Sequence, residues 1–167
     1  FVFPDPVTEL RIEVDLTADM TVYNPFDFFV EASAEVWPFE YPAEIADDLV
    51  IYRKADPAGP LLQGLLNRVP RDALRTTDFI VRLNAQLAAE IGYVIRMEPG
   101  VQTPEETLAI GRGSCRDTSW LLVQVLRHLG FAAWFVSGYL IQLKPDLVAI
   151  DGPAGTDKDF TDLHAWC

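Results

Sequence analysis

The chain has 167 residues, half of which are hydrophobic, and it carries a formal net charge of −12 at pH 7. This length suffices for one ordinary core, and the hydrophobic content excludes a disordered chain. The acidic balance disfavours nucleic acid as a partner, because phosphate backbones are bound by clusters of basic side chains.

The negative charge is concentrated in the first third of the chain. Residues 1–56 hold 13 acids and 3 bases, whereas the remaining residues hold 12 acids and 10 bases. We interpret this excess as a solvated acidic face rather than a site for basic partners.

No apolar stretch is long enough to span a bilayer, and no charged leader precedes an apolar run. We therefore expect no membrane partner and no signal peptide. Two cysteines are too few for a disulfide framework. A reactive thiol survives best where thiols are kept reduced, which favours a cytoplasmic location. The chain begins with Phe1 rather than methionine, which suggests a fragment of a longer protein.

Residues 8–17 alternate apolar and charged side chains, the pattern of a half-buried strand. We assign residues 1–55 to the C-terminal part of an N-terminal β domain and its linker. An exposed strand edge there would favour self-association. We expect the aromatic residues of this region to pack the linker onto the domain, with a binding surface as the alternative. They are Phe26, Phe28, Phe29, Trp37, Phe39 and Tyr41.

Helical signals follow the break at residues 56–60. A short helix is predicted over 61–69, and a second begins near Thr76 or Thr77, either of which can cap it. The sequence Thr-Pro-Glu-Glu at 103–106 combines an N-cap, a proline at the first helical position and a glutamate three residues later. It predicts another helix start. The second helix has an apolar stripe at helical spacing, formed by Phe79, Ile80, Leu83, Leu87 and Ile91.

The next helix starts at Cys115 and is stopped by Gly130. It is apolar over most of its circumference, and a narrow polar stripe carries Arg116, Gln124 and Arg127. A helix of this kind is predicted to be central and buried.

Three segments complete the predicted fold. Residues 131–143 are expected to form a long strand, and residues 160–167 a second one. Between them, residues 144–159 are predicted to form a loop that borders the substrate cleft. The fold class is therefore α+β, with a cysteine-bearing central helix packed on a sheet.

Cys115 lies where a glycine-rich turn gives way to the helix. Ser114 can cap that helix, and Asp117 follows at close to capping-box spacing. Cys115 then occupies the first turn, where unpaired N–H groups and the helix dipole stabilise a thiolate. Arg112 and Arg116 add positive charge nearby. A lone buried cysteine is more often a small hydrophobe, but this setting makes Cys115 a candidate nucleophile.

The chain has two histidines. His128 lies more than three helical turns from Cys115 and cannot reach its sulfur. We assign it to a favourable charge interaction at the helix C-terminus. His164 is remote in sequence but can be brought near by folding, and on a strand it shares one face with Trp166. A cysteine followed well downstream by a histidine is one known order for a thiol dyad, so His164 is the candidate general base.

Several segments carry a family likeness: Gly-Ser-Cys-Arg-Asp at 113–117, Leu-Leu-Val-Gln-Val-Leu-Arg-His-Leu at 121–129, Phe-Val-Ser-Gly-Tyr at 135–139 and Asp-Leu-His-Ala-Trp at 162–166. Together they resemble the bacterial transglutaminase-like superfamily. The sequence Pro-Gly-Val-Gln-Thr-Pro-Glu-Glu-Thr-Leu at 99–108 resembles that family's lead-in to the cysteine. The resemblance spans roughly residues 60–167, with weaker similarity over 8–42.

The resemblance implies a papain-like core over residues 56–167, with Cys115 as nucleophile and His164 as general base. It implies acyl transfer on amide bonds of a protein or peptide substrate, without a cofactor, and it favours hydrolysis over cross-linking. The family's third catalytic residue is an aspartate on the strand after the histidine strand. The chain ends before that strand, so we expect a truncated core that lacks one catalytic residue.

A zinc site and a non-catalytic role are the two alternatives. A zinc site would need Cys115, His164 and Cys167, but His164 and Cys167 would point to opposite faces of a strand, so we expect no metal. Asp162 is two residues from His164 and is not assigned as its orienting acid. The second alternative is a non-catalytic transglutaminase-like binding or scaffold domain. Retention of both Cys115 and His164 argues against it, since a scaffold needs neither.

Overall fold

A computed structural model describes residues 4–17, 19, 24, 27–144 and 156–167. Its early elements are η1 (Ala32–Ala34), β1 (Val36–Trp37), α1 (Ala43–Ala46) and α2 (Val50–Arg53). The longer helices are α3 (Pro60–Arg68), α4 (Thr76–Glu90), α5 (Pro104–Ile110) and α6 (Cys115–His128). The other strands are β2 (Leu74–Arg75), β3 (Gly92–Tyr93), β4 (Arg112–Gly113), β5 (Val136–Gln142) and β6 (Phe160–Trp166). Within the described ranges, no helix combines the length and apolar character that crossing a bilayer requires.

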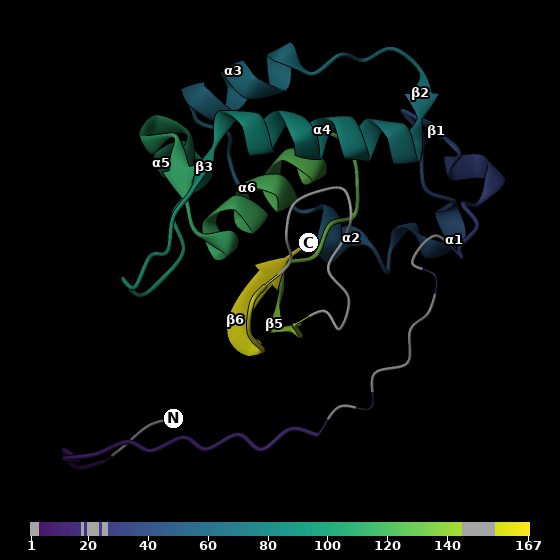
Figure 1. Cartoon of the computed structure of the whole chain (residues 1–167). Coiled ribbons are helices and arrows are strands. Elements are labelled where there is room, and N and C mark those ends of the chain that lie inside the picture. The colour runs from purple at the N-terminus through teal and green to yellow at the C-terminus, as the bar shows by residue number, and fades with distance from the viewer. Residues whose placement is uncertain (1–3, 18, 20–23, 25–26, 145–155) are drawn as a thin grey trace.

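The described strands form three two-stranded sheets. β1 pairs with β2 and β5 pairs with β6, both antiparallel, whereas β3 pairs with β4 in parallel. In Figure 1, β5 and β6 lie on the opposite side of α6 from α3 and α4. The fold therefore mixes helices and strands, as the α+β prediction states.

Helix α6 forms the centre of the molecule, because apolar side chains surround it on several sides. Leu121, Val123 and Val125 are at most 1% exposed, and the helix contacts α2, α3, α5 and β6. Gly130 follows the helix with a φ of 94°, a left-handed conformation that glycine adopts without strain. The predicted start, stop and central burial of this helix are confirmed.

The predicted polar stripe on α6 is wrong at Gln124, which is fully buried. Its side-chain oxygen accepts the Asp56 N–H at 2.8 Å, and its amide donates to the Asp56 carboxylate at 3.0 Å. The cost of burying an amide is offset here because partners from a remote turn satisfy both ends of it.

The linker aromatics divide into two groups. Trp37 is 2% exposed, stacks on Phe79 with ring centroids 3.8 Å apart and donates its indole N–H to the Leu129 carbonyl. The Tyr41 hydroxyl accepts the Ala132 N–H. Packing of the linker onto the domain is thus confirmed for the second half of the run, including Phe39, which packs against the core. By contrast, Phe28 and Phe29 are exposed, and residue 26 lies outside the described ranges.

The strand predicted over residues 8–17 is wrong. The segment is extended but pairs with no described strand, and its apolar positions are more than half exposed. An amphipathic strand needs a neighbouring strand for its backbone and a second layer for its apolar face. Among the described residues, the only strand before residue 60 is β1.

Two further local predictions fail. Thr76 does not cap α4: it is the first residue of the helix, and its hydroxyl donates to the Ala34 carbonyl beside the β1–β2 pair. The strand predicted over 131–143 is shorter, since residues 131–135 are irregular chain, with Phe131 and Ala133 in the core, and β5 begins only at Val136. Residues 145–155, within the predicted loop over 144–159, lie outside the described ranges.

Replacing the buried linker tryptophan tests whether the linker belongs to the core. We expect Trp37→Ala to lower the free energy of unfolding by about 4 kcal/mol, because it leaves a cavity beside Phe79 and Leu129. Urea denaturation followed by circular dichroism measures the loss. The matched control is Phe29→Ala, which removes a 99% exposed ring and should stay within about 0.5 kcal/mol of the wild type. Equal losses for the two variants would contradict this assignment.

Candidate active site

The chain reaches Cys115 through a short, tightly capped helix. At the start of α5, the Thr103 hydroxyl accepts the Glu106 N–H, and the Glu106 carboxylate accepts the Thr103 N–H. The Thr103 N–H and the Thr103 hydroxyl both donate to the Glu106 carboxylate and lower the pKa of Glu106. The cap confirms the helix start predicted at Thr103. Gly111 ends α5 with a φ of 66°, a conformation suited to glycine.

The turn after α5 is held by the parallel β3–β4 pair. Gly92 N–H donates to the Gly111 carbonyl at 2.9 Å, and Val94 N–H donates to the Gly113 carbonyl at 3.0 Å. These bonds fix the direction in which the chain enters α6. Cys115 is therefore positioned by backbone contacts to a segment about twenty residues earlier in the sequence.

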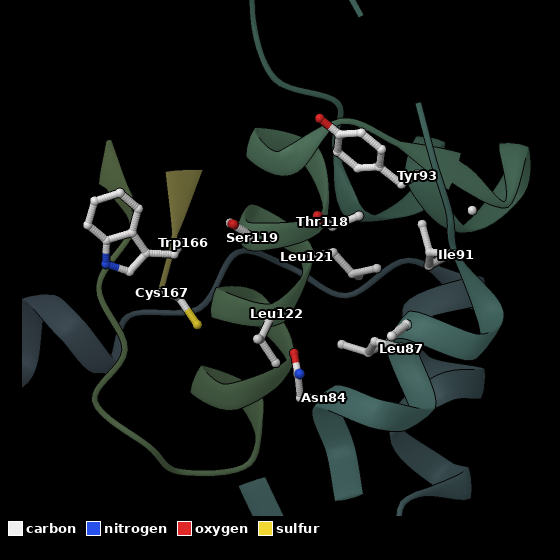
Figure 2. A pocket seen from close by; sticks show the side chains of 12 residues that line it. Asn84, Leu87, Ile91, Tyr93, Thr118, Ser119, Leu121, Leu122, Trp166 and Cys167 are labelled. Atoms are coloured by element: carbon white, nitrogen blue, oxygen red, sulfur yellow. The ribbon is translucent and has the colours of Figure 1, made fainter. Parts of the chain in front are cut away.

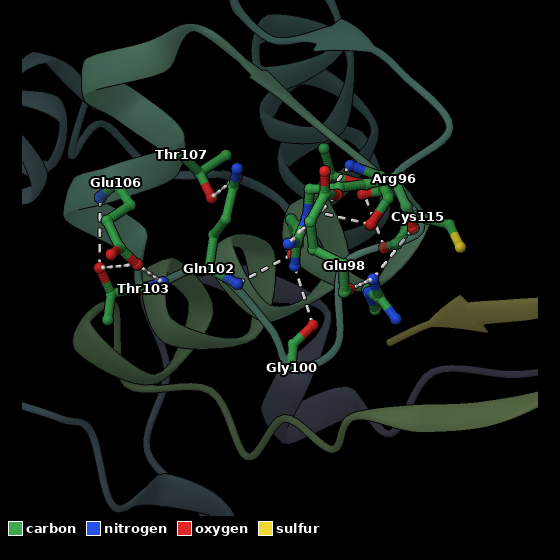
Figure 3. Close-up of polar contacts among 12 residues, drawn as sticks. Arg96, Glu98, Gly100, Gln102, Thr103, Glu106, Thr107 and Cys115 are labelled. Atoms are coloured by element: carbon green, nitrogen blue, oxygen red, sulfur yellow. Dashed lines mark hydrogen bonds and ion pairs between the residues drawn. The ribbon is translucent and has the colours of Figure 1, made fainter.

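Asp117 is the polar centre of this region, and its side chain is fully buried. Its Oδ2 accepts the Ser114 N–H at 2.9 Å and the Ser114 hydroxyl at 2.7 Å. Its Oδ1 accepts the Gln102 N–H at 2.8 Å. Arg96 binds both oxygens, with Nε 2.9 Å from Oδ2 and Nη2 3.1 Å from Oδ1. One carboxylate thus joins the start of α6 to two points of the preceding chain (Figure 3).

Two opposing effects set the charge of Asp117. Burial alone would raise the pKa of this carboxyl, because a charge is poorly solvated there. The hydrogen bonds from Arg96, Gln102 and Ser114 outweigh burial and hold the pKa of Asp117 well below its usual range. These hydrogen bonds therefore favour the anionic form of Asp117.

Position 113 requires a glycine because the backbone there passes close to the Asp117 side chain. A Cβ on Gly113 would lie 2.9 Å from the Asp117 Cβ and 3.4 Å from the Thr107 Cγ2. The first of these distances is shorter than real Cβ contacts allow. The glycine before Ser114 therefore lets the turn pack directly against the first turn of α6.

The two arginines beside Cys115 have different surroundings. The Arg116 guanidinium donates to the carbonyls of Arg96 and Glu98, so it braces the segment between β3 and α5. Arg112 is exposed and lies against Gly92. The positive charge predicted near the cysteine is present, but Arg116 also holds the segment between β3 and α5 in place.

Cys115 is half-buried, and its sulfur points away from the Arg96 cluster (Figure 3). It lines a groove of about 500 Å³ between the β3–α5 segment and the β5–β6 hairpin. His164 lines the same groove from β6. The structure thus brings the two sequence-predicted site residues to one groove from opposite walls. Other side chains of this groove are Tyr93, Ile95, Met97, Phe135, Asp162 and Leu163.

The β5–β6 register explains how His164 is presented. His164 lies directly opposite Gly138, and the Trp166 indole covers this glycine, since a Cβ there would lie 2.8 Å from the indole ring. The His164 and Trp166 rings stack at 6.2 Å. They share one face of β6, as predicted. The glycine in Phe-Val-Ser-Gly-Tyr therefore leaves room for the tryptophan that packs against the histidine.

Trp166 lines a neighbouring pocket rather than the Cys115 groove. This pocket, of about 430 Å³, lies between α4 and α6 and also holds Cys167 (Figure 2). Partial burial raises the pKa of the Cys167 thiol. Among the described residues, no group of three or more His, Cys, Asp or Glu side chains is arranged to hold a metal ion.

Other polar candidates have local roles. The Asp162 carboxylate accepts the N–H of the next residue, Leu163, at 2.7 Å. The His128 ring lies 2.9 Å from the Asp56 carbonyl, remote from the groove. Arg96 is the residue that sequence reasoning missed. Its spacing from Asp117 follows no motif, and its only signal was a charge in an otherwise apolar extended segment.

Comparison with known proteins identifies the family. The sequence model of the Transglutaminase-like superfamily matches residues 63–167, which span the groove and both of its walls. The chain therefore belongs to the transglutaminase-like superfamily, as its sequence motifs indicated. No curated protein and no solved structure matches the chain significantly.

Asp117 and its partners Arg96, Gln102 and Ser114 form a cluster, called the Asp117 hub below. We expect its disruption to lower the free energy of unfolding. Asp117→Asn removes one charge of a buried ion pair, so we expect the free energy of unfolding at pH 7 to fall by about 3 kcal/mol. Urea denaturation followed by tryptophan fluorescence measures this change. A fall below about 1 kcal/mol would show that the carboxylate charge is dispensable.

We also expect Asp117→Asn to change how the free energy of unfolding depends on pH. Folding lowers the pKa of Asp117, so its contribution is complete above the unfolded value of about 3.9 and is lost as the pH falls below it. Asp117→Asn should therefore lose less stability than the wild type between about pH 5 and pH 3. Asp78→Asn, at an exposed acid in the first turn of α4, should keep the wild-type slope. An unchanged slope in Asp117→Asn would contradict the assignment.

Proposed function

We propose that the chain carries a cysteine-dependent acyl-transfer site in which Cys115 is the nucleophile and His164 the general base. The observation that supports this most directly is that both residues line one groove. Membership of the transglutaminase-like superfamily supports the same chemistry. The proposed arrangement is papain-like, with the thiol at the leading end of a central helix and the imidazole on an antiparallel strand.

The proposed reaction has two stages. His164 takes the Cys115 thiol proton, and the thiolate attacks the carbonyl carbon of a protein or peptide amide. The carbon–nitrogen bond breaks, the departing amine receives the proton from His164, and a thioester remains on Cys115. Water or a second amine then attacks the thioester carbon and gives a proton to His164. The carbon–sulfur bond breaks, the acid or the new amide is released, and His164 returns the proton to the Cys115 thiolate.

The first turn of α6 supports stabilisation of the developing oxyanion. Cys115 is the first residue of the helix, so its N–H has no carbonyl one turn earlier within the helix to bind. We assign it as one donor to the oxyanion. The Asp117 hub contributes by holding Ser114 and the start of α6 in place, so it acts as a positioning group.

We propose that hydrolysis is favoured over cross-linking, as in the bacterial members that the chain resembles, and that the protein acts in the cytoplasm. Self-association through an exposed strand edge, expected in the N-terminal segment, remains a separate prediction.

Thiol alkylation tests the dyad against a scaffold role. In a Cys167→Ser background, Cys115 should react with iodoacetamide near pH 6, where ordinary thiols are protonated. His164→Ala should slow this reaction about tenfold or more, and His128→Ala is the matched control, expected to leave the rate unchanged. Mass spectrometry measures the rates. Reactivity that rises only at the pH of free cysteine, without dependence on His164, would favour the scaffold alternative.

Partition of an acyl-enzyme tests hydrolysis against cross-linking. Cys115 can be acylated with 4-nitrophenyl acetate, and the loss of the acetyl group followed in the presence of putrescine. We expect acetate to be the main product, because water is the proposed acceptor. Acetylputrescine as the main product would reverse the assignment to cross-linking.

A further inference from the structure

The end of β3 and the segment that follows it present large apolar side chains to the Cys115 groove. Tyr93, Ile95 and Met97 are 67%, 79% and 87% exposed, although each is large and apolar in body. All three line the groove that contains the sulfur. In Figure 1 the segment projects beyond the helices on the side of β6. Contiguous exposed apolar side chains beside a candidate nucleophile indicate a binding surface.

This exposure is enforced by the Asp117 hub. Arg96 points inward to Asp117, and alternate side chains of an extended chain point to opposite sides. Ile95 and Met97 must therefore point away from the hub. Arg116 fixes the same stretch through the carbonyls of Arg96 and Glu98. The apolar side chains thus belong to a braced segment whose orientation is set by a buried ion pair.

The charges of the groove limit what it can bind. Of the two guanidinium groups that line it, Arg96 is paired with the Asp117 carboxylate, whereas Arg116 donates to backbone carbonyls and keeps its positive charge. The carboxylate of Asp162 lines the same groove, so an acidic side chain would meet charges of both signs there. The facing wall adds Leu163, which is 71% exposed. An uncharged apolar side chain fits these surroundings best.

We infer that Tyr93, Ile95 and Met97 form a specificity wall that selects acyl donors with large apolar side chains. The occupant is a peptide that carries an aliphatic or aromatic residue within two positions on the acyl side of the attacked carbonyl. This part of the substrate stays bound to the Cys115 sulfur after the amine departs, so contacts to it act in both stages. The inference rests on the proposed function of Cys115.

Peptidyl acyloxymethyl ketones, which alkylate active-site cysteines, test this selection on the whole chain. We expect the probe with a Leu-Leu peptide to label Cys115 about 30-fold faster than probes with Gly-Gly or Glu-Glu. In Ile95→Ser/Met97→Ser, the Leu-Leu rate relative to the iodoacetamide rate should approach the Gly-Gly value. Ile51→Ser, at a 66% exposed isoleucine of α2, is the control and should keep the wild-type ratio.

The outcomes separate this inference from the proposed function. Equal rates for the three peptides, while iodoacetamide labelling still depends on His164, would overturn the specificity wall and leave the dyad intact. Labelling that falls as the protein concentration rises would assign the groove to a second copy of the chain and also overturn the inference. Loss of His164 dependence with iodoacetamide would instead refute the proposed function itself.

Discussion

A buried carboxylate holds the candidate site together. Asp117 sits in the first turn of α6 and accepts hydrogen bonds from Ser114, Gln102 and Arg96. An isolated buried charge would be strongly destabilising, so the carboxylate requires these partners around it. Satisfying it fixes the turn before α6 and the extended segment before α5 in one arrangement. The position of the Cys115 sulfur and the exposure of the apolar wall both follow from that arrangement.

The opposite wall of the groove depends on packing rather than charge. β6 pairs with β5 and contacts α6, and its Ala165 is buried. This contact brings His164 to the groove although it is 49 residues from Cys115 in the sequence. Gly138 and Trp166 set the local surface on which the histidine lies. The site is therefore assembled from one wall fixed by an ion pair and one fixed by strand pairing.

Elements with strong local signals could be predicted from the sequence. The capping pair Thr103 and Glu106 defined the start of α5, and Gly130 marked where α6 ends. The mixed α and β class also followed. The strand expected over residues 8–17 did not form, because alternation describes a surface that needs a partner and says nothing about whether one is present. The prediction that Gln124 lies on a polar stripe was wrong for a similar reason, since its burial depends on Asp56 from a remote turn.

The sequence by itself placed Cys115 at the leading end of a central helix, because helix capping and glycine turns are encoded over short distances. It also offered His164 as the candidate general base. Only the tertiary structure decided that both line one groove, that Arg96 is the partner of Asp117 and that Ile95 and Met97 point outward. Such pairings join residues across long loops, and their energies depend on burial, which no local pattern specifies.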